Sequence, residues 1–193
     1  MTGKRAGKPQ LIGAFYGVPD EMLKQIGIVV VLSARLDLTR MKILEAATSV
    51  PVRVSSTYRR PDLKKALKDA FANAPLDRLQ DRMNAWHGQV DQLFNFRDNL
   101  VHSGGAYETR GDGTSRYVRE HAREGERTQF SQSKLEAIIE RLSDAESDGV
   151  GLHIETSVLV SQGPEAHDQM LAQHELYRQA VQRMHEEAAQ TSG

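Results

Sequence analysis

The chain has 193 residues, and its 25 Lys and Arg against 26 Asp and Glu give a formal net charge of −1 at pH 7. This length suits one domain with a sizeable core. The near-neutral charge provides no overall field to hold a polyanion, so any nucleic-acid contact needs a local basic patch. The absence of cysteine excludes disulfides and thiolate metal sites. Because the sequence shows no secretory or membrane-spanning apolar run, we expect a soluble cytoplasmic protein without membrane contact.

The N-terminal part of the chain carries the signals of a long helix. We expect residues 1–18 to be a flexible basic segment and Asp20 to cap a helix over residues 21–48. Residues 26–32 are rich in β-branched side chains, which also suits a strand. The residues after them keep a helical pattern, and we therefore expect one continuous helix.

Prolines divide the next stretch. We expect a loop over residues 51–58 and a short helix over 61–73 that has Pro61 at its start. Pro75 ends that helix. The apolar periodicity that follows predicts a helix over residues 76–102.

Residues 104–130 differ from the rest of the chain, because they are rich in glycine and carry the turn sequence Arg-Gly-Asp-Gly-Thr at 110–114. We expect a small loop or β-hairpin insert here. In the hairpin, residues 106–109 would pair with residues 116–121.

The following stretch predicts a helix with a weak centre. The capping-box motif Ser133-x-x-Glu136 marks its start. We expect Gly149 and Gly151 to interrupt it, because glycine disfavours helix interiors. Residues 152–161 are compatible with helix or strand, and we favour the helix.

The last segment predicts an amphipathic helix. Gly163 and Pro164 break the chain, and residues 165–190 then form a helix before a disordered tail. Its apolar side chains suit docking on the domain or on a partner, and we favour core packing. They are Met170, Leu171, Leu176, Tyr177, Val181 and Met184.

An arginine lies within the apolar stripe of the helix over 76–102. On a 3.6-residue helix, Arg97 falls near the centre of the face that the stripe forms. Burying an unpaired guanidinium is costly, so Arg97 is either locked into a buried ion pair or held at an interface or cleft for use. The apolar members of the stripe are Trp86, Val90, Leu93, Phe94, Leu100 and Val101.

Asp98 and His102 lie four residues apart, so their side chains can meet on one helix face. A carboxylate that touches an imidazole fixes its tautomer and raises its basicity. Glycines follow at once and predict the helix end at the histidine. A simpler interpretation stays open, in which Asp98 and His102 cap the helix and Arg97 pairs with a carboxylate of another helix.

The run Arg97-Asp98-Asn99-Leu100-Val101-His102 resembles the Arg-polar-x-x-x-His signature of the HEPN superfamily, the higher eukaryotes and prokaryotes nucleotide-binding domains. The resemblance implies an all-α fold: a HEPN-like helical bundle with a long helix hairpin and the small insert. It also implies a homodimer and a metal-independent endoribonuclease without a cofactor. We expect a basic N-terminus at 1–18, the HEPN-like domain at 19–165, and a C-terminal helix and tail at 166–193.

The resemblance gives each motif residue a role. His102 takes a proton from a 2′-hydroxyl, and the alkoxide attacks the adjacent phosphate to leave a 2′,3′-cyclic phosphate and a 5′-hydroxyl. Arg97 binds phosphate oxygens, and Asp98 orients the imidazole. Arg97 and His102 stand about 140° apart around an ideal helix. In the family, the motifs of two subunits face each other across a two-fold axis, which brings both copies into one cleft. We expect no metal site.

A basic segment is the candidate RNA-binding surface. Its members are Arg59, Arg60, Lys64, Lys65 and Lys68. A solvated helix face is the alternative that we favour for this segment. For the whole chain, one hypothesis is RNA cleavage in a toxin–antitoxin or phage-defence system, with RNA and an antitoxin or other protein as partners. The other hypothesis is a non-catalytic dimeric scaffold or an RNA- or protein-binding module.

Overall fold

The structure, a computed structural model, describes residues 20–50, 60–102, 104–109, 115–120, 127–129 and 131–191. In the strands, and at residues 60, 61, 102, 188, 190 and 191, it describes the backbone alone. The expected N-terminal segment at 1–18 and the expected loop at 51–58 lie outside these residues.

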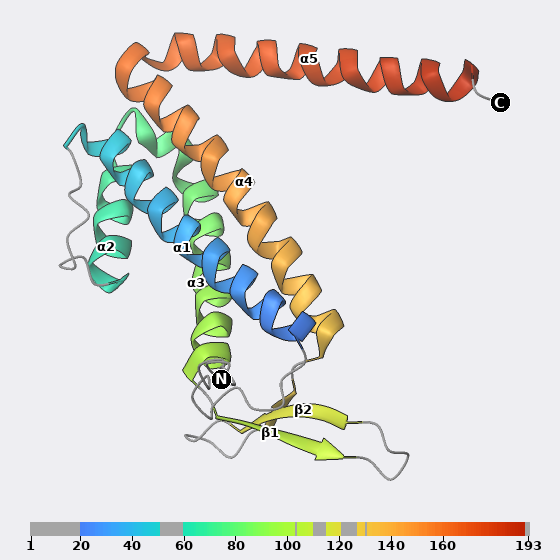
Figure 1. Cartoon of the computed structure of the whole chain (residues 1–193). Coiled ribbons are helices and arrows are strands. Elements are labelled where there is room, and N and C mark those ends of the chain that lie inside the picture. Colours follow the sequence, from blue (N-terminus) through green and yellow to red (C-terminus); the bar gives the residue numbers. More distant parts are fainter. Residues whose placement is uncertain are drawn as a thin grey trace, which may run out of the picture. The chain divides into compact units, whose positions relative to one another are not determined.

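Helices make up most of the described chain, which confirms the helical class (Figure 1). No described helix carries an apolar stretch long enough to cross a bilayer. The helices are α1 (Asp20–Thr48), α2 (Arg60–Phe71), the 3-10 helix η2 (Leu76–Leu79), α3 (Gln80–His102), α4 (Gln132–Gln162) and α5 (Pro164–Thr191). The strands are β1 (Gly104–Thr109), β2 (Ser115–Glu120) and β3 (Arg127–Gln129).

The predicted hairpin is confirmed in the Gly-rich stretch. β1 pairs with β2 in antiparallel register, with Tyr107 opposite Tyr117. β3 adds a third antiparallel strand along β2, with Thr128 opposite Arg119. The sequence did not predict β3, because three residues are too short to show an alternating pattern.

Two compact units divide the described residues. One unit combines the chain up to Ala34 with Asp91–Asp144, and the other combines Arg35–Val90 with the chain from Ala145 onward. Each of α1, α3 and α4 contributes one segment to each unit. The unit that holds Asp91–Asp144 is called unit 1 below, and the other is called unit 2.

In unit 1, the β-branched part of α1 is helical, as expected. Val29 and Ser33 are fully buried, whereas Val30 and Val31 are exposed, which is a helical period. The hydroxyl of Ser33 donates to the carbonyl oxygen of Val29 at 2.7 Å and thereby satisfies a buried polar group. Tertiary burial on one side thus outweighs the β-propensity of this stretch.

The start of α4 differs from the predicted capping box. The backbone N–H of Lys134 donates to the hydroxyl oxygen of Ser131 at 3.2 Å, so Ser131 caps the helix and Ser133 does not. Glu136 instead accepts a hydrogen bond of 3.1 Å from the amide of Gln25, which joins α4 to α1 within unit 1.

The predicted interruption of α4 at its glycines is wrong, because α4 is continuous over 31 residues. A Cβ atom at Gly149 would lie 2.6 Å from Cζ2 of Trp86 and 2.8 Å from the methyl group of Thr39. Gly149 therefore lets α4 approach α3 and α1 closely inside unit 2. No neighbour lies within 4 Å of a Cβ at Gly151. The packing around Trp86 compensates for the low helix propensity of these residues.

Buried polar groups join the helices of unit 2. Arg40 in α1 is completely buried, and its Nη2 donates to Nε2 of the buried His87 in α3. The neighbouring indole of Trp86 donates to the carbonyl oxygen of Ala145 in α4 at 2.6 Å. Both contacts satisfy polar groups that burial would otherwise penalise.

The predicted break between the last two helices is confirmed. Gly163 has a φ of 87°, in the left-handed region that favours glycine. Its N–H donates to the carbonyl oxygen of Leu159 at 3.2 Å and so closes the end of α4. Pro164 then begins α5, where its missing N–H costs nothing.

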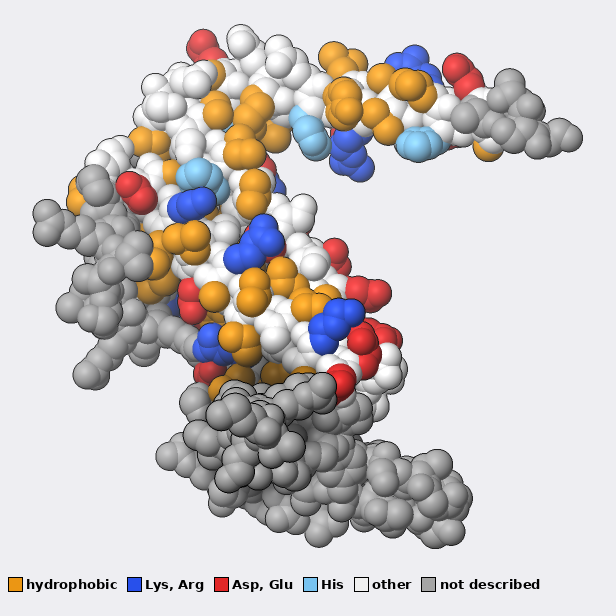
Figure 2. Space-filling model, in the orientation of Figure 1, with side chains coloured by type: hydrophobic (Ala, Val, Ile, Leu, Met, Phe, Trp, Pro, Cys, Tyr) orange, Lys and Arg blue, Asp and Glu red, His pale blue; other side chains and the backbone are white. Residues whose placement is uncertain are grey.

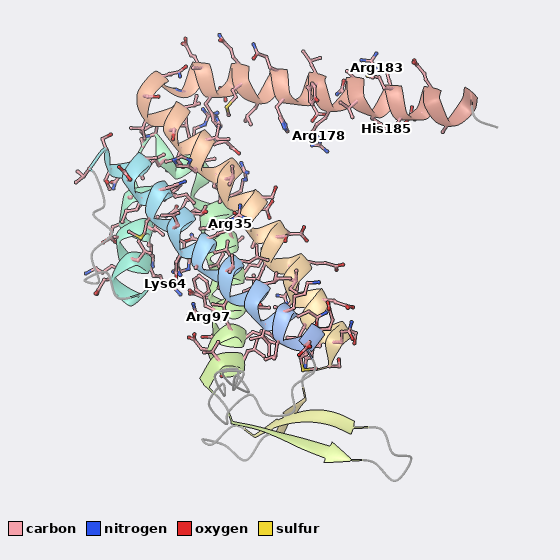
Figure 3. All side chains as sticks on the ribbon, viewed as in Figure 1. Arg35, Lys64, Arg97, Arg178, Arg183 and His185 are labelled. Atoms are coloured by element: carbon pink, nitrogen blue, oxygen red, sulfur yellow. The ribbon has the colours of Figure 1, made fainter. Side chains whose placement is uncertain are left out.

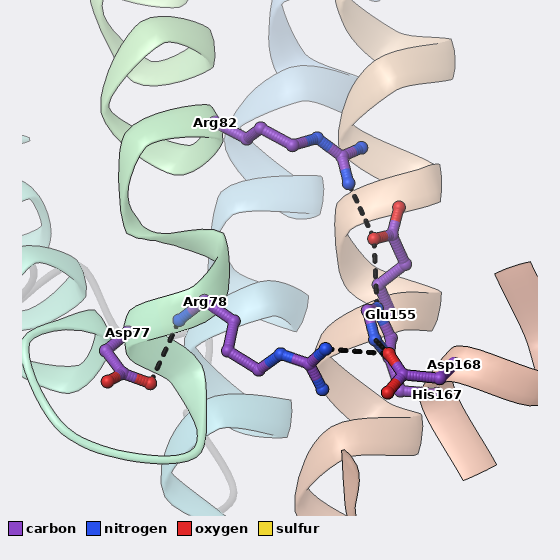
Figure 4. A network of polar contacts seen from close by, with 6 residues as sticks. All are labelled: Asp77, Arg78, Arg82, Glu155, His167 and Asp168. Atoms are coloured by element: carbon purple, nitrogen blue, oxygen red, sulfur yellow. Dashed lines mark hydrogen bonds and ion pairs between the residues drawn. The ribbon is translucent and has the colours of Figure 1, made fainter. Parts of the chain in front are cut away.

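A polar clamp holds the first turn of α5 within unit 2 (Figure 4). We define it as Arg78, Arg82, Glu155, His167 and Asp168. The buried Glu155 accepts from Arg82 at 2.6 Å and contacts Nε2 of His167 at 3.2 Å. Arg78 donates to the carboxylate of Asp168 at 2.7 Å. The clamp therefore joins η2 and α3 to α4 and α5.

The predicted core packing of α5 is wrong. Leu176, Tyr177 and Met184 are 64%, 69% and 68% exposed, and Leu171 is also exposed. Figure 2 shows hydrophobic side chains uncovered along this helix, among histidine and charged side chains. Spacing alone predicted an apolar side of the helix correctly, but it did not predict what would cover that side.

The close contact at Gly149 gives a stability prediction. We expect Gly149→Ala to lower the free energy of unfolding by about 1–3 kcal/mol, because the new methyl group overpacks against Trp86 and Thr39. Urea denaturation followed by circular dichroism measures this change.

Gly151→Ala is the matched control in the same helix. Its methyl group meets open space, so the gain in helix propensity of about 0.5–1 kcal/mol dominates. Equal effects of the two substitutions would contradict the role assigned to Gly149.

The clamp gives a pH-dependent prediction. Burial raises the pKa of the Glu155 carboxyl, but the hydrogen bonds and charges of Arg82 and His167 outweigh burial and hold this pKa below its ordinary value. The stability from the ionised carboxylate is therefore present above about pH 4.3, the ordinary pKa, and is lost as the pH falls through the lowered pKa. We expect Glu155→Gln to cost about 1–3 kcal/mol at pH 7.

Urea denaturation of the wild type and of Glu155→Gln at pH 7 and at acid pH checks the direction. The difference between the two proteins should shrink at acid pH. Glu140→Gln, at an exposed position of α4, is the control and should change stability little at either pH. A difference that grows on acidification would contradict the assigned sign.

Candidate functional site

Arg97 lies near the C-terminal end of α3, in unit 1 (Figure 3). Its Nε and Nη2 both donate to Oδ1 of Asp98, at 3.0 and 2.7 Å. The guanidinium carbon lies 5.2 Å from the centroid of the Phe94 ring, a cation–π distance. The side chain is 18% exposed, so it is partly desolvated and still reaches water.

The apolar stripe around Arg97 is confirmed in part. Leu93, Phe94 and Leu100 are buried, as expected. Val101 was expected on the same buried face, but it is 47% exposed. This face of α3 is therefore buried up to Leu100 but exposed at Val101, and the partly exposed Arg97 lies close to that boundary.

Asp98 contacts Arg97, whereas the sequence predicted a contact with His102. One carboxylate oxygen, Oδ1, receives both hydrogen bonds from the guanidinium. His102 is the last residue of α3, and its side chain lies outside the described residues. The predicted contact between Asp98 and His102, and the catalytic role of all three residues, stay predictions.

The described residues leave one edge of the Arg97 guanidinium without a hydrogen bond. Nε and Nη2 are taken by Asp98, and Nη1 has no hydrogen-bond partner among the residues that the structure describes. A guanidinium with an available N–H edge can bind an oxyanion. Phe94 and Asp98 fix its orientation, which lowers the entropic cost of binding such a ligand.

The basic segment is described in part. Lys64, Lys65 and Lys68 are exposed on α2 in unit 2, and the side chains of Arg59 and Arg60 lie outside the described residues. An RNA-binding role for this segment stays a prediction.

Two polar groupings in unit 2 were not predicted from the sequence. The contact between His87 and Arg40 has no signal in the spacing, because the two residues lie 47 positions apart. The clamp likewise links α3 to α4 and α5 over long sequence separations. In the part of the chain that the structure describes, no three histidine, aspartate or glutamate side chains group as metal ligands would.

Comparison with known proteins adds no relative: no family model, curated protein or solved structure matches the chain.

Proposed function

We propose that the chain is a metal-independent endoribonuclease of the HEPN type. In this proposal, His102 is the general base that deprotonates the 2′-hydroxyl. Arg97 binds the phosphate and stabilises the negative charge that develops on it during attack. The products are a 2′,3′-cyclic phosphate and a 5′-hydroxyl.

The state of Arg97 is the observation that carries this proposal. A purely structural arginine in an apolar stripe would be expected to bury its charge fully in an ion pair. Arg97 instead keeps partial exposure and an Nη1 edge without a partner among the described residues, while Asp98 and Phe94 hold it in place. This is a preorganised anion-binding group, five residues before the histidine of the same motif.

The proposal includes a two-fold homodimer with the motif helices near the axis. Arg97 and His102 diverge around α3, so one copy does not aim both side chains at one phosphate. Two copies of the motif that face each other in one cleft would supply an arginine and a histidine to the same phosphate. An antitoxin-like protein partner belongs to the same proposal.

A non-catalytic dimeric scaffold or RNA- or protein-binding module is the alternative. The hydrogen bonds between Arg97 and Asp98 favour it, because a neighbouring carboxylate competes with phosphate for the guanidinium. The two hypotheses differ in whether the exposed edge of Arg97 serves catalysis.

The ribonuclease proposal predicts loss of activity on two substitutions. We expect His102→Ala and Arg97→Ala each to lower the rate of RNA cleavage by about 10²–10³, because each removes a group that acts mainly in the transition state. Labelled RNA incubated with excess chelator measures this rate, and wild-type cleavage should persist there. An all-DNA strand should stay intact, because it lacks the 2′-hydroxyl.

Arg141→Ala is the control for loss of a positive charge, because Arg141 is exposed in unit 1 on α4. It should leave the rate nearly unchanged. Cleavage that survives in His102→Ala, or that stops with chelator, would refute the assigned chemistry. A folded dimer that cleaves no RNA would favour the scaffold.

Asp98 gives a graded prediction. Asp98→Asn keeps a side-chain oxygen that can accept a hydrogen bond, so we expect a milder loss of activity than in Asp98→Ala. Steady-state cleavage rates of the two variants test this order. Equal losses would mean that the negative charge of Asp98, and not its hydrogen-bonding oxygen, is the property that matters.

A further inference from the structure

A carboxylate of its own helix already binds one edge of the Arg97 guanidinium. Asp98 uses a single oxygen, Oδ1, to accept hydrogen bonds from Nε at 3.0 Å and from Nη2 at 2.7 Å. We call the edge formed by these two nitrogens the side edge of Arg97. Arginine uses such a pair of N–H groups to bind two oxygens of one phosphate. Asp98 therefore occupies donors that a phosphate ligand would use.

The ion pair between Arg97 and Asp98 is local to α3 and partly exposed. Adjacent residues of a helix do not face each other, so both side chains must lean around the helix to make this contact. The side chain of Asp98 is 37% exposed, and water can therefore take over its hydrogen bonds when it moves away. Because exposed ion pairs add little stability, a competing oxyanion can replace the carboxylate at a low cost in free energy.

Phe94 gives Arg97 a second support that does not depend on Asp98. The guanidinium carbon lies 5.2 Å from the centroid of the Phe94 ring, and this ring is only 1% exposed, so packing fixes its position. The ring attracts the positive charge through its face, whereas a carboxylate takes up N–H donors. Arg97 can thus keep its place on α3 while the partner at its side edge changes.

We propose that Asp98 is an intramolecular competitor of phosphate, which holds the side edge of Arg97 until a backbone phosphate of RNA displaces it. This role rests on the proposed function, from which RNA is taken as the ligand. The oxygen of Asp98 positions the guanidinium, and its negative charge lowers the affinity of Arg97 for phosphate. Asp98 is therefore the residue that determines how strongly a phosphate must bind before it gains Arg97.

Asp98→Asn separates the oxygen from the charge, because asparagine accepts a hydrogen bond but is neutral. We expect it to lower the dissociation constant of a short 2′-O-methylated RNA strand about fivefold, the upper range for release of a partly exposed ion pair. Fluorescence anisotropy of the labelled strand with the full chain measures this constant. The methyl groups block attack by the 2′-hydroxyl, so binding is measured apart from cleavage. The milder loss of activity expected for the same substitution concerns the rate with bound RNA.

Two controls distinguish competition at Arg97 from a general effect of charge. In an Arg97→Ala background the competitor has no guanidinium to hold, so Asp98→Asn should leave the dissociation constant nearly unchanged. Asp144→Asn removes one negative charge from an exposed position of α4 in the same unit, and it should also have little effect. Equal tightening by Asp98→Asn with and without Arg97, or by Asp144→Asn, would overturn the proposal.

The binding assay also separates this role from the ribonuclease proposal. Tighter binding that depends on Arg97 would support the competitor role even where no protein cleaves RNA. Binding by Asp98→Asn no tighter than by the wild type, or no binding by either, would overturn it even where the wild type cleaves RNA. Asp98→Ser is a second uncharged variant and should tighten binding in the same direction, and circular dichroism checks that each variant remains helical.

Discussion

A buried guanidinium constrains the packing of unit 2. Arg40 can only donate hydrogen bonds, so Nε2 of His87 must accept, which requires a neutral ring with its proton on Nδ1. The adjacent Trp86 donates to Ala145 and lies against Gly149. Two consecutive residues of α3 therefore determine how α1 and α4 approach it within this unit. Loss of the His87 ring would leave the Arg40 guanidinium with an unsatisfied buried donor. A larger side chain at Gly149 would overlap with the ring of Trp86.

Arg40 and Arg97 illustrate different uses of the same side chain. Arg40 is fully buried, and it contacts the buried His87 and, at 3.8 Å, the more exposed carboxylate of Asp37. Arg97 in unit 1 is partly exposed, and its ion pair involves the next residue of its own helix. The partial exposure of Arg97 leaves its guanidinium in contact with solvent. This difference in exposure, rather than the motif alone, is the physical support for the proposal that Arg97 binds phosphate.

The sequence predicted what local chemistry determines. Helix periodicity, the break at Gly163 and the hairpin depend on residues close together in the chain, and these predictions are confirmed. The errors arose where a distant partner decides the outcome. Gly149 was predicted to interrupt a helix, because the sequence does not show that Trp86 packs against it. The apolar side of α5 was predicted to be part of the core, because the sequence does not show that it is exposed. For the candidate site, spacing allowed Asp98 to meet His102 but did not predict its hydrogen bonds with Arg97.

The junction at Gly163 and Pro164 also allows α4 and α5 to unwind independently of each other. α4 ends with the bond from Gly163 to Leu159, and the helical ladder restarts with the N–H of His167 donating to the carbonyl oxygen of Gly163. Proline has no N–H with which to carry that ladder across the junction. Unwinding of α5 from its C-terminal end therefore need not propagate into α4. The amide hydrogens of α5 can exchange with solvent through local opening of that helix. Those of α4 exchange only when the core that α4 helps to form unfolds.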